Sequence, residues 1–140
     1  MHQTQRRLSR IPPGDPRLLE GARLFNAGAF FESHEVWETL WHEVGGRERE
    51  LLQGLIQIAA AYHHLARKNY AGALYLYTKG RARLARWGPR RAGIALDALL
   101  AKVDGDIEQV RRGQRLSAPP VIAVRPAVSA ERRSGKREHP

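Results

Sequence analysis

Apolar side chains recur at i, i+3, i+4 and i+7 along most of this chain, the spacing that places them on one face of an α-helix. The pattern predicts an all-α protein and shows no convincing strand. The predicted helices cover about residues 15–26, 29–44, 47–68, 70–87 and 94–112. Helix-starting and helix-stopping pairs, such as Asp15-Pro16 and Gly88-Pro89, stand at their ends. We therefore expect a single bundle of about five antiparallel helices.

The third predicted helix, 47–68, is apolar around most of its circumference. Its polar positions form one narrow stripe, made of Glu50, Gln53, Gln57, His64 and Lys68. A helix with so little polar surface is typical of the centre of a bundle.

Two weaker patterns refine this fold. Asp104-Gly105-Asp106 interrupts the fifth helix and predicts a weak point or kink, because the rest of a calcium-loop pattern is missing. An aromatic residue stands three before a small one at both Phe30/Ser33 and Tyr70/Ala73, about 40 residues apart. This spacing favours helical hairpins with tetratricopeptide-like packing.

The 140 residues suffice for one domain with a core of several helices. We expect a flexible N-terminal segment over 1–14, a helical bundle domain over 15–112, and a basic Pro/Arg-rich tail over 113–140. The tail lacks apolar periodicity and is expected to be irregular or disordered, although 121–124 could pack locally.

Composition narrows the function classes. The absence of cysteine excludes disulfides, thiol nucleophiles and thiolate metal sites, and it fits a cytoplasmic protein. No apolar run reaches membrane-spanning length. The formal net charge of +10 comes mostly from the two ends, which could make weak nonspecific contact with nucleic acid, although solubility is the simpler explanation. A homo-oligomer is left open.

The candidate chemistry lies in the second predicted helix. His34, Glu38 and Trp41 fall within about 60° of one another around a helix of 3.6 residues per turn. Phe30 and Trp37 lie on the same side, so His34 is expected near the middle of an apolar face. A histidine and a carboxylate in such a place must be hydrogen-bonded, paired or bound to metal.

The spacing His34-x-x-x-Glu38-x-x-Trp41 resembles the motif of domain-of-unknown-function family 309, small all-α prokaryotic proteins. The likeness continues over roughly residues 18–87, through Leu52-Gln53-Gly54-Leu55-Ile56-Gln57, His64 and Asn69-x-x-Gly72-Ala73. The resemblance implies a helical bundle of unestablished activity, whose His/Glu/Trp motif has been suspected of binding a metal.

A metal site is chemically reasonable here. An imidazole and a carboxylate one helical turn apart can reach the same zinc-like divalent ion, so His34 and Glu38 are predicted ligands and His64 the predicted third. Trp41, Gln53 and Gln57 are predicted to line the same pocket. Two alternatives stay open: a buried hydrogen-bond network that fixes helix register, and a simply solvated helix edge.

A second candidate is a basic patch. Its six residues have no acid between them and resemble a phosphate-contacting surface; they are Lys79, Arg81, Arg83, Arg86, Arg90 and Arg91. The patch lacks a recognisable nucleic-acid motif, so a solvated face is the alternative.

The sequence therefore predicts a cytoplasmic helical-bundle protein with a metal- or small-ligand-binding pocket built on the His34/Glu38 motif. The alternative is a non-catalytic interaction module that binds a protein or nucleic-acid partner, with the His/Glu pair as a structural network. No nucleophile–base pair or phosphate loop is visible, so catalytic residues are not assigned and enzymatic activity is left open.

Overall fold

The structure is a computed structural model of the chain and describes residues 8–116 and 121–124. Within these residues the helices are α1 (Pro16–Asn26), α2 (Phe30–Glu43), α3 (Glu48–Ala66), α4 (Tyr70–Leu84) and α5 (Leu96–Arg111). A short 3₁₀ helix, η1 (Ala85–Trp87), and two strands, β1 (Arg90–Arg91) and β2 (Ile94–Ala95), join α4 to α5. The predicted all-α bundle is confirmed.

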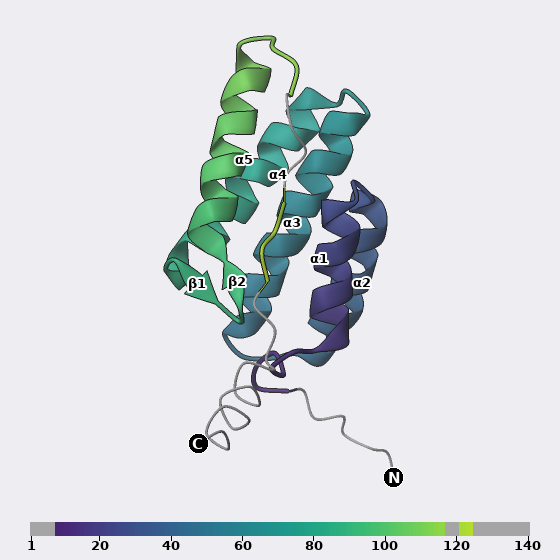
Figure 1. Ribbon diagram of the computed structural model, residues 1–140, viewed down its shortest axis with the longest axis vertical. Coiled ribbons are helices and arrows are strands. Elements are labelled where there is room, and N and C mark those ends of the chain that lie inside the picture. The colour runs from purple at the N-terminus through teal and green to yellow at the C-terminus, as the bar shows by residue number, and fades with distance from the viewer. Residues whose placement is uncertain (1–7, 117–120, 125–140) are drawn as a thin grey trace, which may run out of the picture.

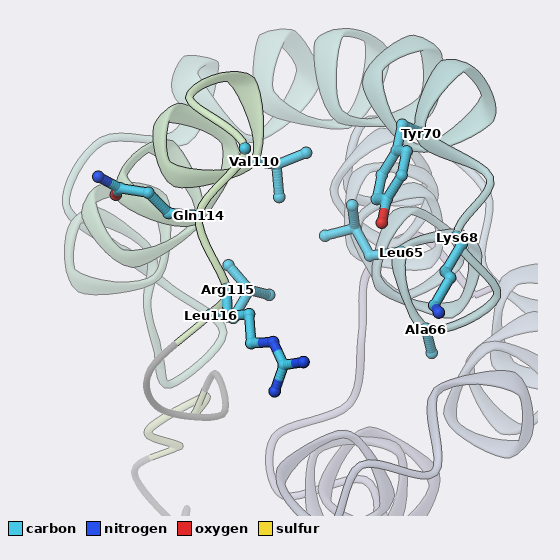
Figure 2. Close-up of a pocket in the computed structure, with 9 residues that line it drawn as sticks. Leu65, Ala66, Lys68, Tyr70, Val110, Gln114, Arg115 and Leu116 are labelled. Atoms are coloured by element: carbon cyan, nitrogen blue, oxygen red, sulfur yellow. The ribbon is translucent and has the colours of Figure 1, made fainter.

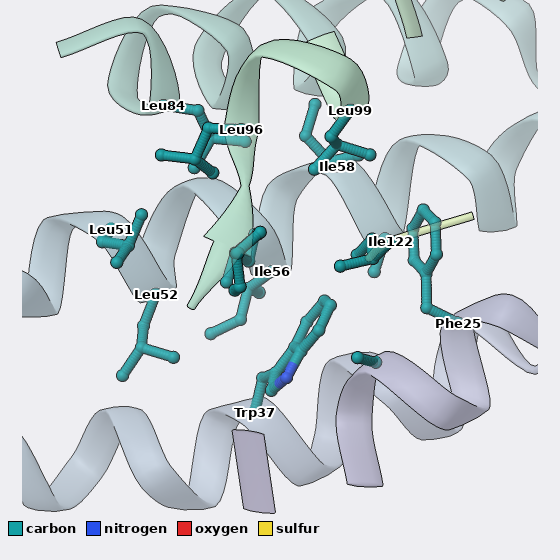
Figure 3. Close-up of a cluster of buried hydrophobic side chains, with 14 of the residues drawn as sticks. Phe25, Trp37, Leu51, Leu52, Ile56, Ile58, Leu84, Leu96, Leu99 and Ile122 are labelled. Atoms are coloured by element: carbon teal, nitrogen blue, oxygen red, sulfur yellow. The ribbon is translucent and has the colours of Figure 1, made fainter. Parts of the chain in front are cut away.

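Helix α3 runs through the centre of the molecule, with the α1–α2 hairpin on one side and α4 and α5 on the other (Figure 1). This is the position that its nearly continuous apolar surface predicted. Figure 3 shows Trp37 between α2 and side chains of α3 such as Ile56. The Trp37 side chain is wholly buried, and its Nε1–H donates to the carbonyl of Leu18 at 3.1 Å.

Side-chain caps fix where two of the helices begin. Asp15 accepts a hydrogen bond from the backbone N–H of Arg17 at 2.8 Å, and Pro16 occupies the first position of α1. Asn69 accepts one from the N–H of Gly72 at 3.1 Å and so starts α4. These caps are local in sequence, which is why the helix starts could be predicted.

The expected interruption of the fifth helix is wrong. Helix α5 continues from Leu96 to Arg111 through both aspartates. Asp106 accepts hydrogen bonds from the Tyr62 hydroxyl of α3 and the Lys102 ammonium one turn before it. Asp104 accepts two hydrogen bonds from Arg81 of α4, so both acidic residues tie α5 to a neighbouring helix.

A β-turn that the sequence pattern did not indicate precedes α5. Strands β1 and β2 pair antiparallel, with Arg91 opposite Ile94. Ala92 and Gly93 lie between them with φ of 52° and 82°, as a two-residue type I′ turn requires. The turn places Ile94 in the core, where its side chain is fully buried.

Segments outside the predicted 15–112 domain also pack on the bundle. Ile11 is buried, and its backbone N–H donates to the Glu48 carboxylate at 2.6 Å. Ile122 is buried too, and its backbone exchanges two hydrogen bonds with the side chain of Asn26 in α1. Ile11 thus packs on the bundle although it lies before the predicted domain, and Ile122 shows the local packing allowed for 121–124. Residues 1–7, 117–120 and 125–140 lie outside the described residues.

Among the residues described, no helix combines the length and the hydropathy that crossing a lipid bilayer requires.

Candidate ligand-binding site

Helix α2 holds the motif at the edge of the core. Ser33, Trp37 and Leu40 form the buried stripe of α2. His34 and Glu38 each follow a residue of this stripe in the sequence and so lie beside it, with side chains 26% and 47% exposed. The expectation that His34 sits near the middle of an apolar face is therefore wrong, because the apolar stripe is narrower than the sequence suggested.

The two motif residues are close but not hydrogen-bonded. His34 Nε2 lies 3.6 Å from Glu38 Oε2, beyond the 2.7–3.2 Å of an N–H···O bond. The other ring nitrogen of His34, Nδ1, is buried and has no hydrogen-bond partner within the part of the chain that the structure describes. The pair does not form the closed network that a purely structural role would favour.

A small open pocket lies between α2 and α3 beside this pair. It has a volume of about 170 Å³, and its lining residues are Phe31, His34, Ala60, His63 and His64; we call it the histidine pocket. The Phe31 ring lies against the pocket, with its centroid 6.0 Å from that of His34 and 5.5 Å from that of His63. The accessible wall is mainly apolar, and three of its five lining residues are histidines.

The proton on His64 can be assigned from its neighbours. Its Nδ1 lies 3.0 Å from the amide nitrogen of Asn69, whose amide oxygen accepts from the N–H of Gly72. Because the oxygen is used in capping α4, the Asn69 NH₂ must be the group that faces the imidazole. His64 Nδ1 is then the acceptor, and neutral His64 carries its proton on Nε2.

This arrangement bears on the predicted metal ligands. A histidine binds metal through an unprotonated nitrogen, and at His64 the Asn69 amide already occupies that nitrogen. No three His, Asp or Glu side chains among the described residues stand together as a metal-binding group. The structure brings His34 and Glu38 together but does not assemble them with His64 into one ligand set.

The other predicted pocket residues lie elsewhere. Trp41 packs beneath the guanidinium of Arg49, whose central carbon is 3.5 Å from the ring centroid. Gln57 accepts a hydrogen bond from Arg83 at 3.4 Å, and Gln53 is half-buried on α3. The histidine pocket is therefore not lined by Trp41, Gln53 or Gln57.

Sequence reasoning missed three lining residues of this pocket, namely Phe31, Ala60 and His63. Helical spacing could have indicated two of them, since Phe31 precedes His34 by three positions and Ala60 precedes His64 by four. His63 is only partly buried.

Ion pairs divide the predicted basic patch. Arg81 bonds Asp104 at 2.8 Å, Arg83 bonds Glu50 at 3.0 Å, and Arg91 bonds Glu48 at 2.9 Å. The ammonium of Lys79 lies 5.4 Å from the centroid of the Tyr75 ring. Since acids from α3 and α5 neutralise half of the patch, the structure favours a solvated face with ion pairs over a continuous phosphate-contacting surface.

Comparison with known proteins bears on the family. A search of curated proteins gives no match. One family model, described as a domain of unknown function (DUF309), matches residues 18–83. That range runs from α1 almost to the end of α4 and contains every residue of the histidine pocket. The resemblance found in the sequence is confirmed, since residues 18–83 match the DUF309 family model.

Proposed function

We propose that this protein is a non-catalytic binding protein whose histidine pocket holds a small, largely apolar ligand. The observation that carries the proposal is a cavity of about 170 Å³ with apolar walls and three imidazoles at its lining. An apolar cavity of about 150 Å³ accommodates one benzene ring. The histidine pocket is therefore large enough for a ligand built on a single ring.

The lining also limits the chemistry of the ligand. Phe31 offers a ring face for stacking, and His64 offers its Nε2–H as a hydrogen-bond donor in the assigned tautomer. A single-ring compound with one hydrogen-bond acceptor fits both features. Because Phe31 is 47% exposed and the pocket is open, we expect only moderate affinity.

A zinc-like ion is the second candidate, and one distance favours it. Two ligands of a tetrahedral zinc ion with bonds of 2.0–2.1 Å stand about 3.3 Å apart. The 3.6 Å between His34 Nε2 and Glu38 Oε2 is close to this separation. A third ligand would have to come from α3 by reorientation of His63 or His64, which makes the metal site less well supported than the ligand pocket. An interaction module remains a further prediction from the sequence.

Thermal unfolding of the full chain separates the candidates, because a ligand that binds only the folded state raises the melting temperature. The titrants are the neutral ring compounds phenol and benzyl alcohol, and zinc chloride. We expect phenol or benzyl alcohol to raise the melting temperature, and Ala60→Leu to abolish that shift by filling the pocket from α3. His42→Ala is the matched control, since His42 is an exposed histidine of α2 outside the pocket.

The same titrations show how each candidate fails. A zinc-dependent shift that disappears in His34→Ala and Glu38→Gln but persists in Ala60→Leu would replace the organic ligand with a metal ion at the motif. If neither ring compound raises the melting temperature of the unaltered protein, the ligand proposal is wrong. Equal loss of the shift in His42→Ala would show that binding does not occur in the pocket.

A further inference from the structure

A larger pocket lies where α3 ends, α4 begins and α5 ends (Figure 2). Its volume is about 330 Å³, within the range of small-molecule sites. Apolar side chains of Leu65, Val110 and Leu116 line one part of it, and polar side chains of Lys68, Tyr70 and Arg115 line another. We call it the terminal pocket. Both pockets include residues of α3, but they have no lining residue in common.

The charge around the terminal pocket has one sign. Among the residues that the structure describes, its lining includes the cations Lys68 and Arg115 and no acidic residue. Figure 2 shows Arg115 and Lys68 on opposite sides of the pocket, with Leu65 between them and Tyr70 above Leu65. The nearby carboxylate of Glu108 is bound to Arg112 at 3.1 Å. This end of the bundle is thus complementary to a negatively charged ligand with an apolar part.

The backbone at Lys68 provides a separate observation. Lys68 follows α3 in the left-handed conformation, with φ of 62°, while the N–H of Asn69 bonds the carbonyl of His64 and that of Lys68 bonds the carbonyl of Leu65. These are the two bonds of a Schellman cap, in which glycine is the favoured residue at this position. A lysine is less favourable than glycine there, so the presence of Lys68 beside the pocket costs the fold some stability.

We propose that the terminal pocket binds a small organic anion, a carboxylate with a short apolar body. The carboxylate lies between Lys68 and Arg115 within reach of the Tyr70 hydroxyl, and the apolar body covers Leu65, Val110 and Leu116. Both halves of the ligand are needed. The cations are exposed, so water and salt screen their attraction for an anion, and the apolar wall alone cannot orient a ligand.

Calorimetric titration of the full chain with three probes tests the two halves. Hexanoate has the charge and the apolar body, hexanol has only the body, and inorganic phosphate has only the charge. We expect hexanoate to bind at least about tenfold more tightly than either of the others. Equal affinity for phosphate would reduce the site to a counter-ion surface, and equal affinity for hexanol would remove the role of the cations; either result overturns the proposal.

The variant Lys68→Gly tests the site without destabilising the fold, so a loss of binding could not be due to misfolding. Glycine suits the left-handed backbone, so the melting temperature should stay the same or rise, while hexanoate affinity falls about tenfold. Arg86→Ala is the matched control, because it removes one exposed charge beyond the far end of α4. Unchanged hexanoate binding in Lys68→Gly, or an equal loss in Arg86→Ala, would show that the terminal pocket is not the anion site.

Discussion

The polar side chains on the two sides of α3 differ in how completely they are bonded. On the α5 side, Asp106 accepts from the Tyr62 hydroxyl at 2.5 Å and from Lys102 at 2.9 Å. On the α2 side, His34 and Glu38 stand 3.6 Å apart, and one ring nitrogen of His34 has no partner among the described residues. We call Asp106 with its partners Tyr62 and Lys102 the closed set, because each of these side chains is hydrogen-bonded. His34 and Glu38 lie at the rim of a pocket and are not hydrogen-bonded to each other.

A second aspartate of α5 repeats the closed arrangement nearer the surface. Asp104 accepts from the Tyr77 hydroxyl at 2.6 Å and from two nitrogens of Arg81 at 2.8 Å each. Burial, followed by the hydrogen bond to Asp106, raises the pKa of Tyr62, so its hydroxyl stays protonated and donates. These bonds fix how α5 packs on α3 and α4.

The contrast indicates which polar side chains are able to bind a ligand. A buried polar group whose hydrogen bonds are all made stabilises one arrangement of helices and has no free donor or acceptor for a ligand. A half-buried group with an unused nitrogen beside a cavity can bond something else. By this criterion Asp104 and Asp106 are structural, and the histidines of α2 and α3 are the candidates for binding.

The largest effect is expected from Asp106→Ala. It leaves the buried Tyr62 hydroxyl without an acceptor and separates Lys102 from its partner. We expect a loss of about 3 kcal/mol in the free energy of unfolding, measured with urea. Tyr62→Phe, which removes only one bond, should cost about 1 kcal/mol. Losses below about 0.5 kcal/mol in both variants would show that the closed set does not hold α5.

A smaller effect, with a pH signature, is expected at Asp104. The hydrogen bonds from Arg81, opposed by burial and aided by Tyr77, hold the pKa of the Asp104 carboxyl below its usual 3.8. The unfolded chain therefore takes up the proton first as pH falls, so the stabilisation is complete above about pH 4 and is lost progressively below it.

The variant Asp104→Asn keeps the shape of the side chain and removes this charge. Because Asp104 is about one-third exposed, we expect a cost of only about 1 kcal/mol at neutral pH. Below pH 4 the variant and the unaltered protein should approach the same stability in urea titrations. A constant difference at all pH values would mean that the carboxylate charge is not what stabilises the contact.

The fold could be predicted where the deciding interactions are local. Helix periodicity and the caps at Asp15 and Asn69 involve residues within three positions of one another. The contacts that were missed are single residues packing across long separations: Ile122 bonds Asn26, which is 96 positions away. The turn before α5 was missed because Ala92 occupies a left-handed position where asparagine or glycine would have been the usual indication.

The site could be predicted only in part for the same reason. Spacing along one helix brought out His34 and Glu38, but whether they bond each other depends on how α3 packs against α2. The sequence predicts a weak point or kink at the aspartates of α5, where a glycine separates them. Their partners Tyr77 and Tyr62 lie 27 and 44 positions away, which local pattern does not connect.

The smallest effect is expected from His34→Ala. His34 makes no hydrogen bond that the variant would lose among the residues described, and removal of its buried Nδ1 relieves an unpartnered polar atom. We expect the free energy of unfolding in urea to change by less than about 0.5 kcal/mol, as at other half-exposed helix positions. Trp37→Ala on the same helix is the matched contrast, with an expected loss of about 3–5 kcal/mol because that side chain fills the core. If His34→Ala instead costs more than about 2 kcal/mol, His34 belongs with the closed set, and the distinction between the two sides of α3 fails.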